Sequence, residues 1–265
     1  MPGIKRLRAP IVYQGGKFKE IHHIFEHEPS DIGTFVDVFG GGGVVALNFS
    51  ARGVSTHYND LFSPLVLMYQ TLQDQAATEA LQKRLDSITP SLQEHAAICC
   101  GEKGVLERLF YITRCTMGVD PHYTKTPTPR FRERTTELKT SILPPSVKLV
   151  DYVPHVSKWR ITQKDFRDVL AEYKDDADAF LYCDPPYVSK TTKQYTTAFT
   201  TADLLQIYEF MKDPNTKCRV MLNVDYTGWT REVFADLLRT AYPVTYGVKG
   251  TANIYQKYHL ILTNY

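Results

Sequence analysis

Four consecutive glycines at residues 40–43 constrain the fold of this chain more than any other feature of its sequence. Residues 34–39 before them have the apolar pattern of a buried strand, and residues 44–47 after them form an apolar run typical of a helix. Glycine lets a ligand approach the backbone closely, and a helix N-terminus offers N–H groups that lack partners within the helix. The sequence therefore predicts a strand, a glycine turn and a helix that bind a ligand. A turn that needs glycine only for its geometry is the alternative.

A carboxylate follows the next predicted strand. Asp60 comes directly after residues 56–59, and an acid at this place can accept hydrogen bonds from both ribose hydroxyls of an adenosyl ligand. The glycine turn and Asp60 together fit NAD, FAD and S-adenosylmethionine about equally well. A solvated loop acid or a helix cap is the plainer interpretation of Asp60.

A second motif, Asp-Pro-Pro-Tyr at residues 184–187, follows residues 179–183, which have the pattern of a buried strand. In an open sheet, groups just past the carboxyl end of a strand face the ligand crevice. Asp184 offers a charged acceptor, Pro185 a carbonyl without an N–H beside it, and Tyr187 an aromatic face. Two acceptors and an aromatic face suit a planar group with an exocyclic amine. An NAD-dependent dehydrogenase would leave this motif unexplained.

Strand and helix patterns alternate before residue 72 and again in residues 158–265, which favours a mostly parallel sheet with helices on both faces. We therefore expect an α/β, Rossmann-like, doubly wound fold. Residues 73–157 differ, because a helical part is followed by a proline-rich part that has the pattern of a loop from residue 114. We expect one domain made of residues 1–72 and 158–265, with residues 73–157 as an insertion.

Three local patterns predict helix positions. Ser63 followed by Pro64 predicts an N-cap and the first helical residue. Thr200 followed three residues later by Asp203 predicts a capped helix start. A further apolar helical face is predicted from Val233, Phe234, Leu237 and Leu238.

Charge is unevenly distributed along the chain. The formal net charge is +2, but residues 114–148 hold seven Lys and Arg against three Asp and Glu. The small total excludes a protein that binds nucleic acid through its net charge alone, whereas a local basic patch remains compatible with such binding.

Cysteine usage and hydropathy argue against metal-binding, membrane-spanning and secreted classes of protein. The five cysteines include no CxxC pair, so we expect free thiols of a reducing cytosol and no zinc or other metal site. No uncharged run approaches the roughly 18 apolar residues that a membrane span needs. Residues 1–10 are basic without a following apolar stretch, which is unlike a secretory signal. We expect a cytoplasmic protein of a bacterium, or of a phage in a bacterial cell.

In these motifs the chain resembles the Dam-type DNA adenine methyltransferases, the alpha group of the D12 class. Tyr13-Gln14-Gly15-Gly16-Lys17 is similar to the family's N-terminal aromatic-Gly-Gly-Lys motif, and residues 35–43 resemble its cofactor loop. Asn59-Asp60 resembles its ribose-binding motif, and residues 184–187 are its complete DPPY motif. Residues 161–166 resemble the segment whose acid lies near the cofactor adenine, and residues 195–199 the loop after DPPY.

This resemblance implies the methyltransferase fold and a site-specific enzyme that moves a methyl group from S-adenosylmethionine to N6 of an adenine flipped out of duplex DNA. S-adenosylhomocysteine is the implied product, and residues 73–157 become a target-recognition insertion. A companion restriction endonuclease is a candidate partner, while the oligomeric state stays open. Methylation of cytosine N4 and a catalytically silent DNA-binding relative remain alternatives. Methylation of cytosine C5 needs a Pro-Cys nucleophile, and the sequence has no Pro-Cys.

The motifs and the resemblance give three sets of candidate residues. The catalytic set is Asp184, Pro185, Pro186 and Tyr187. The cofactor-binding set is Tyr13, Lys17, Asp37, Phe39, Gly40, Gly41, Gly42, Gly43, Asp60, Asp165 and Asp184. The DNA-binding set is Arg114, Lys125, Arg130, Arg132, Arg134, Lys190, Lys193 and Tyr195.

Overall fold

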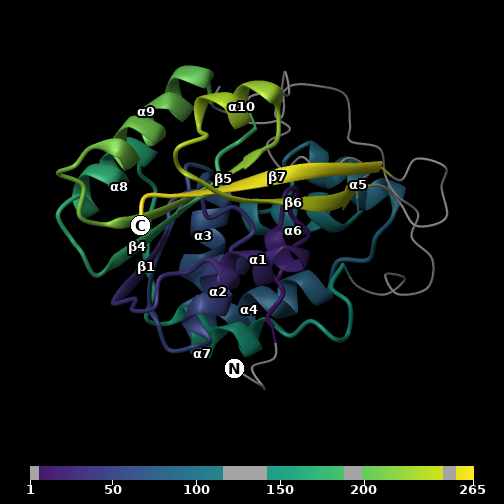
Figure 1. Ribbon diagram of the computed structural model, residues 1–265. Coiled ribbons are helices and arrows are strands. Elements are labelled where there is room, and N and C mark those ends of the chain that lie inside the picture. Colours follow the sequence, from purple (N-terminus) through teal and green to yellow (C-terminus); the bar gives the residue numbers. More distant parts are fainter. Residues whose placement is uncertain (1–5, 116–141, 188–198, 247–254) are drawn as a thin grey trace.

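The strands of the chain form one seven-stranded sheet with the order β3-β2-β1-β4-β5-β7-β6 (Figure 1). The computed structural model describes residues 6–115, 142–187, 199–246 and 255–265. Strands β1 to β5 run parallel to one another, and β7 runs antiparallel to both β5 and β6. The strands are β1 (Thr34–Asp37), β2 (Ser55–Asn59), β3 (Arg160–Thr162), β4 (Ala179–Cys183), β5 (Arg219–Asp225), β6 (Leu238–Tyr246) and β7 (Tyr255–Thr263). The expected doubly wound α/β fold is confirmed.

Apolar side chains cover both faces of the central strands. All five residues of β4 are buried, as expected for a parallel strand between two layers of helices. Because successive side chains of a strand point to opposite faces, Phe180 and Tyr182 join one apolar core while Leu181 and Cys183 join the other. The glycine turn after β1 and the DPPY motif after β4 are thus anchored on strands packed from both sides.

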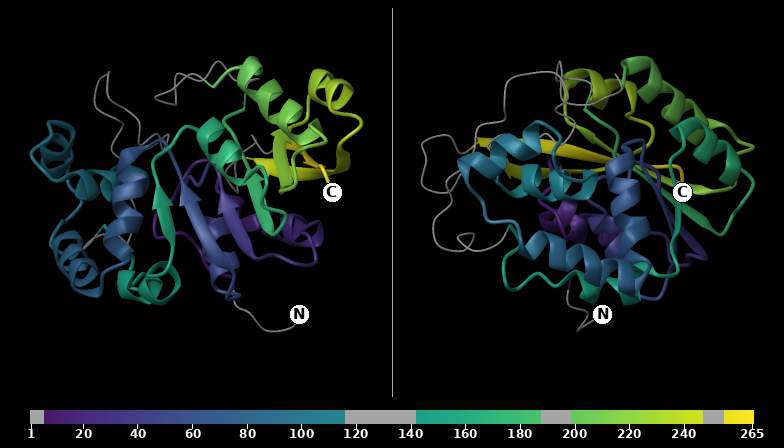
Figure 2. Two further views of the ribbon diagram at one scale, coloured as in Figure 1. Left: turned by 90° about the vertical axis from the view of Figure 1, so that its left-hand side faces the viewer. Right: turned by 180° about the vertical axis from the view of Figure 1, so that it is seen from behind.

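Helices flank the sheet on both faces (Figure 2). The first core receives side chains of α1 (Ile21–Glu26), α2 (Val44–Ser50), α3 (Ser63–Leu72) and α7 (Val153–Val156). The second receives those of α8 (Phe166–Tyr173), α9 (Thr201–Lys212) and the end of α10 (Gly228–Val233). Two short 3-10 helices are η1 (Lys17–Lys19) and η3 (Leu149–Tyr152).

Three helices of the predicted insertion lie beyond the β3 edge of the sheet (Figure 2). They are α4 (Gln75–Asp86), α5 (Leu92–Cys99) and α6 (Val105–Cys115). α4 and α6 pack on α3, and their buried residues Leu81 and Phe110 belong to the same apolar core as Phe35 of β1. The apolar core therefore continues from the sheet into these helices, and the proposed domain boundaries remain a prediction.

Two of the local helix predictions need correction. α3 begins at Ser63 with Phe62 as its N-cap, because a carboxylate oxygen of Asp60 accepts the N–H of Phe62 and holds the turn one residue earlier. The helical face predicted across residues 233–238 is wrong. α10 ends at Val233, and a turn leads to Leu238, where pairing with β7 begins. The predicted capping box of Thr200 is confirmed at the start of α9.

None of the helices in the described ranges is long and apolar enough to cross a membrane.

Candidate active site

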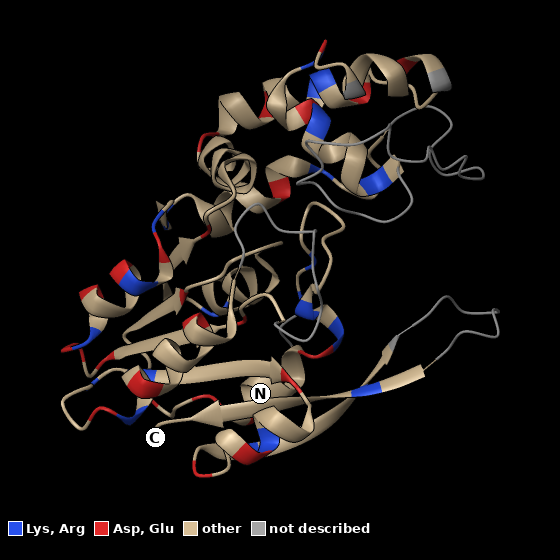
Figure 3. Ribbon diagram, turned by 90° about the horizontal axis from the view of Figure 1, so that it is seen from above, with Lys and Arg blue, Asp and Glu red and all other residues tan. Residues whose placement is uncertain are grey.

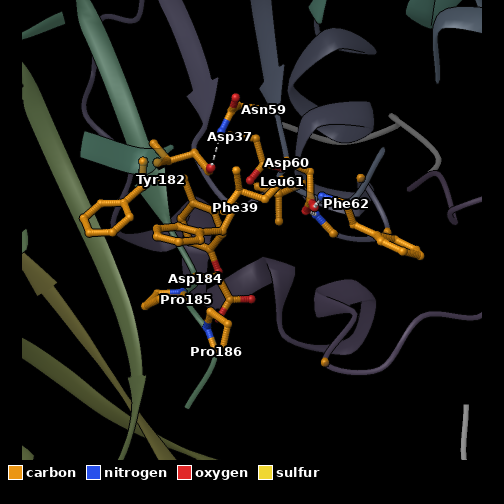
Figure 4. A pocket seen from close by; sticks show the side chains of 18 of the residues that line it. Asp37, Phe39, Asn59, Asp60, Leu61, Phe62, Tyr182, Asp184, Pro185 and Pro186 are labelled. Carbon is orange, nitrogen blue, oxygen red and sulfur yellow. Dashed lines mark hydrogen bonds between the residues drawn. The ribbon is translucent and has the colours of Figure 1, made fainter. Parts of the chain in front are cut away.

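A cavity of about 360 Å³ lies at the carboxyl ends of β1 and β4 (Figure 4). The strand order reverses between these two strands, and this reversal opens the crevice in which doubly wound proteins bind their ligands. The cavity is lined by residues 13–17, the turn 37–45, residues 59–62, residues 164–167 and residues 184–187, together with Tyr182, Phe199 and Asp203. The glycine turn and the DPPY motif, predicted separately from the sequence, therefore share one cavity of a size suited to a small molecule.

Two tyrosines beneath the glycine turn explain part of its composition. The hydroxyl of Tyr58 donates to the carbonyl of Gly41 at 2.7 Å, and that of Tyr69 donates to the carbonyl of Gly42 at 2.6 Å. A Cβ at Gly40 would overlap the ring of Tyr58, and one at Gly43 would overlap the hydroxyl of Tyr69. The role of these two tyrosines could not be predicted from the sequence, because they are indistinguishable from ordinary core residues in the apolar patterns of β2 and α3.

Asp60 holds the other side of the turn. Its two carboxylate oxygens accept the backbone N–H of Gly41 at 2.8 Å and of Phe62 at 2.7 Å. Burial raises the pKa of Asp60 to about 6, although both hydrogen bonds oppose the shift. Each oxygen keeps a further lone pair, so the carboxylate can still accept hydroxyl groups from a ligand in the cavity.

Lys17 lies next to the DPPY motif. Its Nζ is 2.6 Å from Oδ2 of Asp184, and only 3 % of the residue is exposed. Burial alone would lower the pKa of Lys17, but the carboxylates of Asp184 and Glu20 outweigh it and raise the pKa. Burial raises the pKa of Asp184, and the ammonium of Lys17 opposes that shift. Lys17 and Tyr13 both line the cavity, and their role in holding the methyl donor remains a prediction.

The remaining cofactor candidates also line the cavity, including Tyr13, Phe39 and Asp37. Asp37 is buried at the end of β1, and burial together with the nearby Asp184 carboxylate raises its pKa well above the ordinary range. Asp165 caps α8, where its carboxylate accepts the backbone N–H of Arg167 at 2.9 Å.

Of the eight DNA-binding candidates, Arg114 alone lies within the residues that the structure describes. Arg114 lies in the last turn of α6, not in a loop, and its Nη2 donates to the carbonyl of Pro10 at 2.6 Å. The other seven lie outside the described residues: Lys125, Arg130, Arg132, Arg134, Lys190, Lys193 and Tyr195.

The lining of the cavity favours a cationic ligand over a dinucleotide. Five aspartates and three cationic side chains line it, which is a formal net charge of −2. The pyrophosphate of NAD or FAD would add negative charge to this surface, whereas a sulfonium would be attracted to it. Tyr182 also lines the cavity, and its buried hydroxyl has no hydrogen-bond partner within the described ranges. A polar, positively charged ligand therefore fits these residues. In the same ranges, no group of three or more His, Cys, Asp or Glu side chains is placed to hold a metal ion.

Comparison with known proteins gives one matching family and several relatives. The model of the D12 class N6 adenine-specific DNA methyltransferases matches residues 13–97 and 143–246. The chain is 22% identical over 267 residues to the Type II methyltransferase M.CviBI of Paramecium bursaria Chlorella virus NC1A, covering 97% of this chain and 99% of that protein.

Two longer relatives match over part of their length. The modification methylase StsI of Streptococcus sanguinis is 33% identical over 79 residues, which are 30% of this chain and 12% of that protein. The Type II methyltransferase M.FokI of Planomicrobium okeanokoites is 22% identical over 197 residues, which are 70% of this chain and 30% of that protein.

Proposed function

This chain belongs to the D12 class N6 adenine-specific DNA methyltransferase family, and we propose that it uses the cavity at β1 and β4 to hold the methyl donor beside a flipped adenine. It is a site-specific DNA methyltransferase that acts on the N6 amino group of adenine. The observation that carries the proposal is the meeting of the glycine turn and the DPPY motif in one cavity. The cytosine N4 alternative is not favoured by the family match.

The chain's own residues suit S-adenosylmethionine. The turn at residues 40–43 would hold the donor against its backbone, with Tyr13 over the turn and the Asp60 carboxylate at the ribose hydroxyls. Asp165 also lines the cavity, and the resemblance implies that it lies near the donor's adenine. When bound, S-adenosylmethionine supplies a methyl group activated by its positively charged sulfur.

Asp184 and Pro185 would act on the target amine. The lone pair of an adenine amino nitrogen is delocalised into the ring, which makes the nitrogen a weak nucleophile. The Asp184 carboxylate and the Pro185 carbonyl would each accept one N–H, which draws the nitrogen toward tetrahedral geometry and directs its lone pair at the methyl group. Positioning and fixed charges then supply most of the rate. No strong base is needed, because the methylated nitrogen is acidic and loses its extra proton readily.

Access to the amine requires base flipping, which costs a few kcal/mol in unpaired and unstacked bases. Tyr187 would stack on the flipped adenine. Lys190, Lys193 and Tyr195 follow the DPPY motif in sequence, and we propose that they close over the base. Phosphate contacts would come from the basic segment of residues 114–148, including Arg114 and Lys125.

The names of the relatives support a role in restriction–modification, since two are Type II methyltransferases and one is a modification methylase. We propose a companion restriction endonuclease on this basis, and a cytoplasmic location because the substrate is DNA.

The test of the proposed chemistry is Asp184→Ala, with labelled methyl transfer to DNA from a strain that lacks adenine methylation. Loss of the first acceptor is expected to lower the single-turnover rate by about 10²- to 10³-fold, in the range found for removal of one preorganised polar group. Asp184→Asn keeps one acceptor oxygen, and its single-turnover rate is expected to lie between those of the wild type and Asp184→Ala. Asp175→Ala is the control, because Asp175 is an exposed carboxylate bonded only to Lys217 in the described ranges.

Three measurements accompany the rate. Calorimetry of S-adenosylmethionine binding and thermal unfolding show whether the site and the fold survive, which matters because Asp184→Ala leaves the buried Lys17 ammonium without its partner. Nucleoside analysis of the product identifies the methylated base. A wild-type rate in Asp184→Ala, or N4-methylcytosine as the product, would overturn the proposal.

A further inference from the structure

A closed ring of polar side chains lies behind the DPPY motif, and the chemistry proposed above uses only part of it. Every member has a polar atom within 3.4 Å of a polar atom of each of its two neighbours around the ring. The ring consists of Asp184, Lys17, Tyr187, His259, Glu20, Tyr242 and Asn223. They come from η1, the residue before α1, β5, β6, β7 and the segment after β4, so the ring joins parts of the chain that are far apart in sequence.

One half of the ring holds the two DPPY side chains. Lys17 Nζ contacts Oδ2 of Asp184 at 2.6 Å and the hydroxyl of Tyr187 at 3.3 Å. Asn223 donates from Nδ2 to Oδ1 of Asp184 at 3.3 Å. Both oxygens of the carboxylate are therefore fixed by a separate donor, and each oxygen retains a lone pair for a substrate N–H.

The other half of the ring centres on Glu20. Its Oε2 lies 2.9 Å from Nδ1 of His259 and 3.0 Å from the hydroxyl of Tyr242. The same Tyr242 hydroxyl is 3.0 Å from Oδ1 of Asn223, and its single proton can be donated to Glu20 or to Asn223 but not to both at once. The Tyr187 hydroxyl is 3.4 Å from Nε2 of His259. Since a carboxylate can only accept, Nδ1 of His259 carries the proton that faces Glu20. Glu20 therefore reaches Tyr187 through His259 and reaches Asp184 through Tyr242 and Asn223.

The part of the ring away from the cavity is deeply buried, whereas Asp184, Tyr187 and Glu20 are partly exposed. His259, Tyr242 and Asn223 are each no more than 2 % exposed. Burial alone would raise the pKa of Glu20, but the His259 hydrogen bond and the Lys17 ammonium lower it. Glu20 is thus a second anion near Lys17, and its charge, like that of Asp184, raises the pKa of the buried ammonium. A carboxylate held in this way has few alternative orientations.

We propose that Glu20 and His259 are positioning residues for methyl transfer, which act through Tyr242 and Asn223 to fix the Asp184 carboxylate and the Tyr187 ring before the adenine enters. This inference rests on the proposed function. Neither residue touches the adenine or the donor in this account, so their loss should slow the chemical step more than it weakens binding. If the ring served stability alone, interrupting it would lower the unfolding temperature and leave the rate of methyl transfer unchanged.

Two variants interrupt the ring at different points. Glu20→Gln keeps the size and one acceptor oxygen but removes the charge that faces Lys17. Tyr242→Phe removes only the hydroxyl that joins Glu20 to Asn223, and it keeps the aromatic ring in the core. The matched control is Glu26→Gln at the other end of α1, where Glu26 forms a similar pair with His23 at 3.3 Å but is largely exposed and outside the ring.

Single-turnover methyl transfer, with enzyme in excess over DNA, is measured beside calorimetric binding of S-adenosylmethionine and thermal unfolding. Glu20→Gln and Tyr242→Phe are expected to slow transfer by about 10- to 100-fold, as small misplacements of reacting groups do, with little change in donor affinity. Glu26→Gln is expected to match the wild type. Wild-type rates in both ring variants would overturn the positioning role while the proposed function stands. An inactive wild-type enzyme would overturn the proposed function, and the positioning role with it.

Discussion

Gly43 illustrates how one residue can be required for two separable reasons. Its φ of +74° is left-handed, and a Cβ there would overlap the Tyr69 hydroxyl. Gly53 has a similar φ of +84°, but nothing lies within 4 Å of the place that its Cβ would take. The two positions therefore separate the cost of the backbone conformation from the cost of the steric overlap.

We expect Gly53→Ala to lower the free energy of unfolding by about 1 kcal/mol, the usual cost of a left-handed non-glycine residue. Gly43→Ala should lose a further 1–3 kcal/mol or so, because Tyr69 must move and release the Gly42 carbonyl. Urea unfolding of both variants measures the difference. Equal losses would show that Tyr69 gives way without cost.

Asp60 gives donor binding a specific pH dependence. The carboxylate form accepts two hydroxyl groups and the protonated form does not, and the pKa of the buried carboxyl is about 6. Affinity for S-adenosylmethionine should be constant above this pH and fall below it, approaching tenfold for each pH unit. Calorimetry between pH 5 and 8 tests this, and Asp60→Asn should bind weakly with no such slope. A wild-type affinity that is flat across pH 6 would contradict the assignment.

The sequence could predict the cavity residues but not the ring behind them. Asp60 and the motif of residues 184–187 each follow a predicted strand, so chain order alone places them at the carboxyl edge of the sheet. Glu20, Asn223 and His259 have no such pattern. No motif or spacing distinguishes them from other polar residues of the chain, and only tertiary packing brings them within hydrogen-bonding distance of their partners.

At the scale of elements, a buried histidine joins β2 to β3 and α8. His57 contacts the Thr162 hydroxyl through Nε2 at 2.7 Å and the Tyr173 hydroxyl through Nδ1 at 2.9 Å. Burial, assisted by the nearby guanidinium of Arg160, lowers the pKa of His57 to about 4. His57 is therefore neutral in the folded protein at neutral pH and held by two hydroxyl groups.

The sign of the resulting stability change follows from the lowered pKa. The unfolded chain takes up a proton at this histidine near pH 6.5, whereas the folded chain does so only near pH 4, so stability falls as the pH drops between these values. The loss should reach about 3 kcal/mol at most. His57→Gln removes the titrating group, and its free energy of unfolding should decline less than that of the wild type between pH 7 and pH 5. Parallel declines would exclude His57 as the cause.

The start of α9 and the end of α10 show how a local signal differs from one that depends on distant contacts. The Thr200 capping box satisfies two backbone groups within four residues and sets the start of α9. The end of α10 depends instead on where β6 begins to pair with β7, which is a contact between distant parts of the chain. Apolar spacing around Phe234 reflects burial in the second core, and the same spacing is compatible with a turn.

For the whole molecule, the doubly wound architecture was predictable because strand and helix patterns alternate. The order of the last two strands was not. β7 inserts antiparallel between β5 and β6, and no periodicity of the sequence distinguishes that arrangement from a further parallel strand. This insertion carries His259 to the ring around Asp184, so a feature of the whole sheet determines a detail of the site.

The distribution of charge over the molecule determines how it should hold DNA. Lys and Arg alternate with Asp and Glu over the described helices and strands (Figure 3). Many of these charges form ion pairs, such as Lys174 with Asp213 and Lys212 with Asp236. Residues 114–148 instead have a cationic excess of four, although the whole chain carries only +2. Release of counterions from DNA should therefore depend mainly on that segment.

We expect Arg130→Gln, Arg132→Gln and Arg134→Gln combined to weaken DNA binding and to reduce the slope of log affinity against log salt concentration by roughly three, because each lost phosphate contact removes about 0.9. The control removes three cations elsewhere, Lys174, Lys212 and Lys217, each already paired with an aspartate. Their pairs neutralise charge within the protein, so replacing them with glutamine should leave the slope unchanged. Fluorescence anisotropy over a salt series measures both. A loss of slope in the control alone would move the DNA-binding face to α8 and α9.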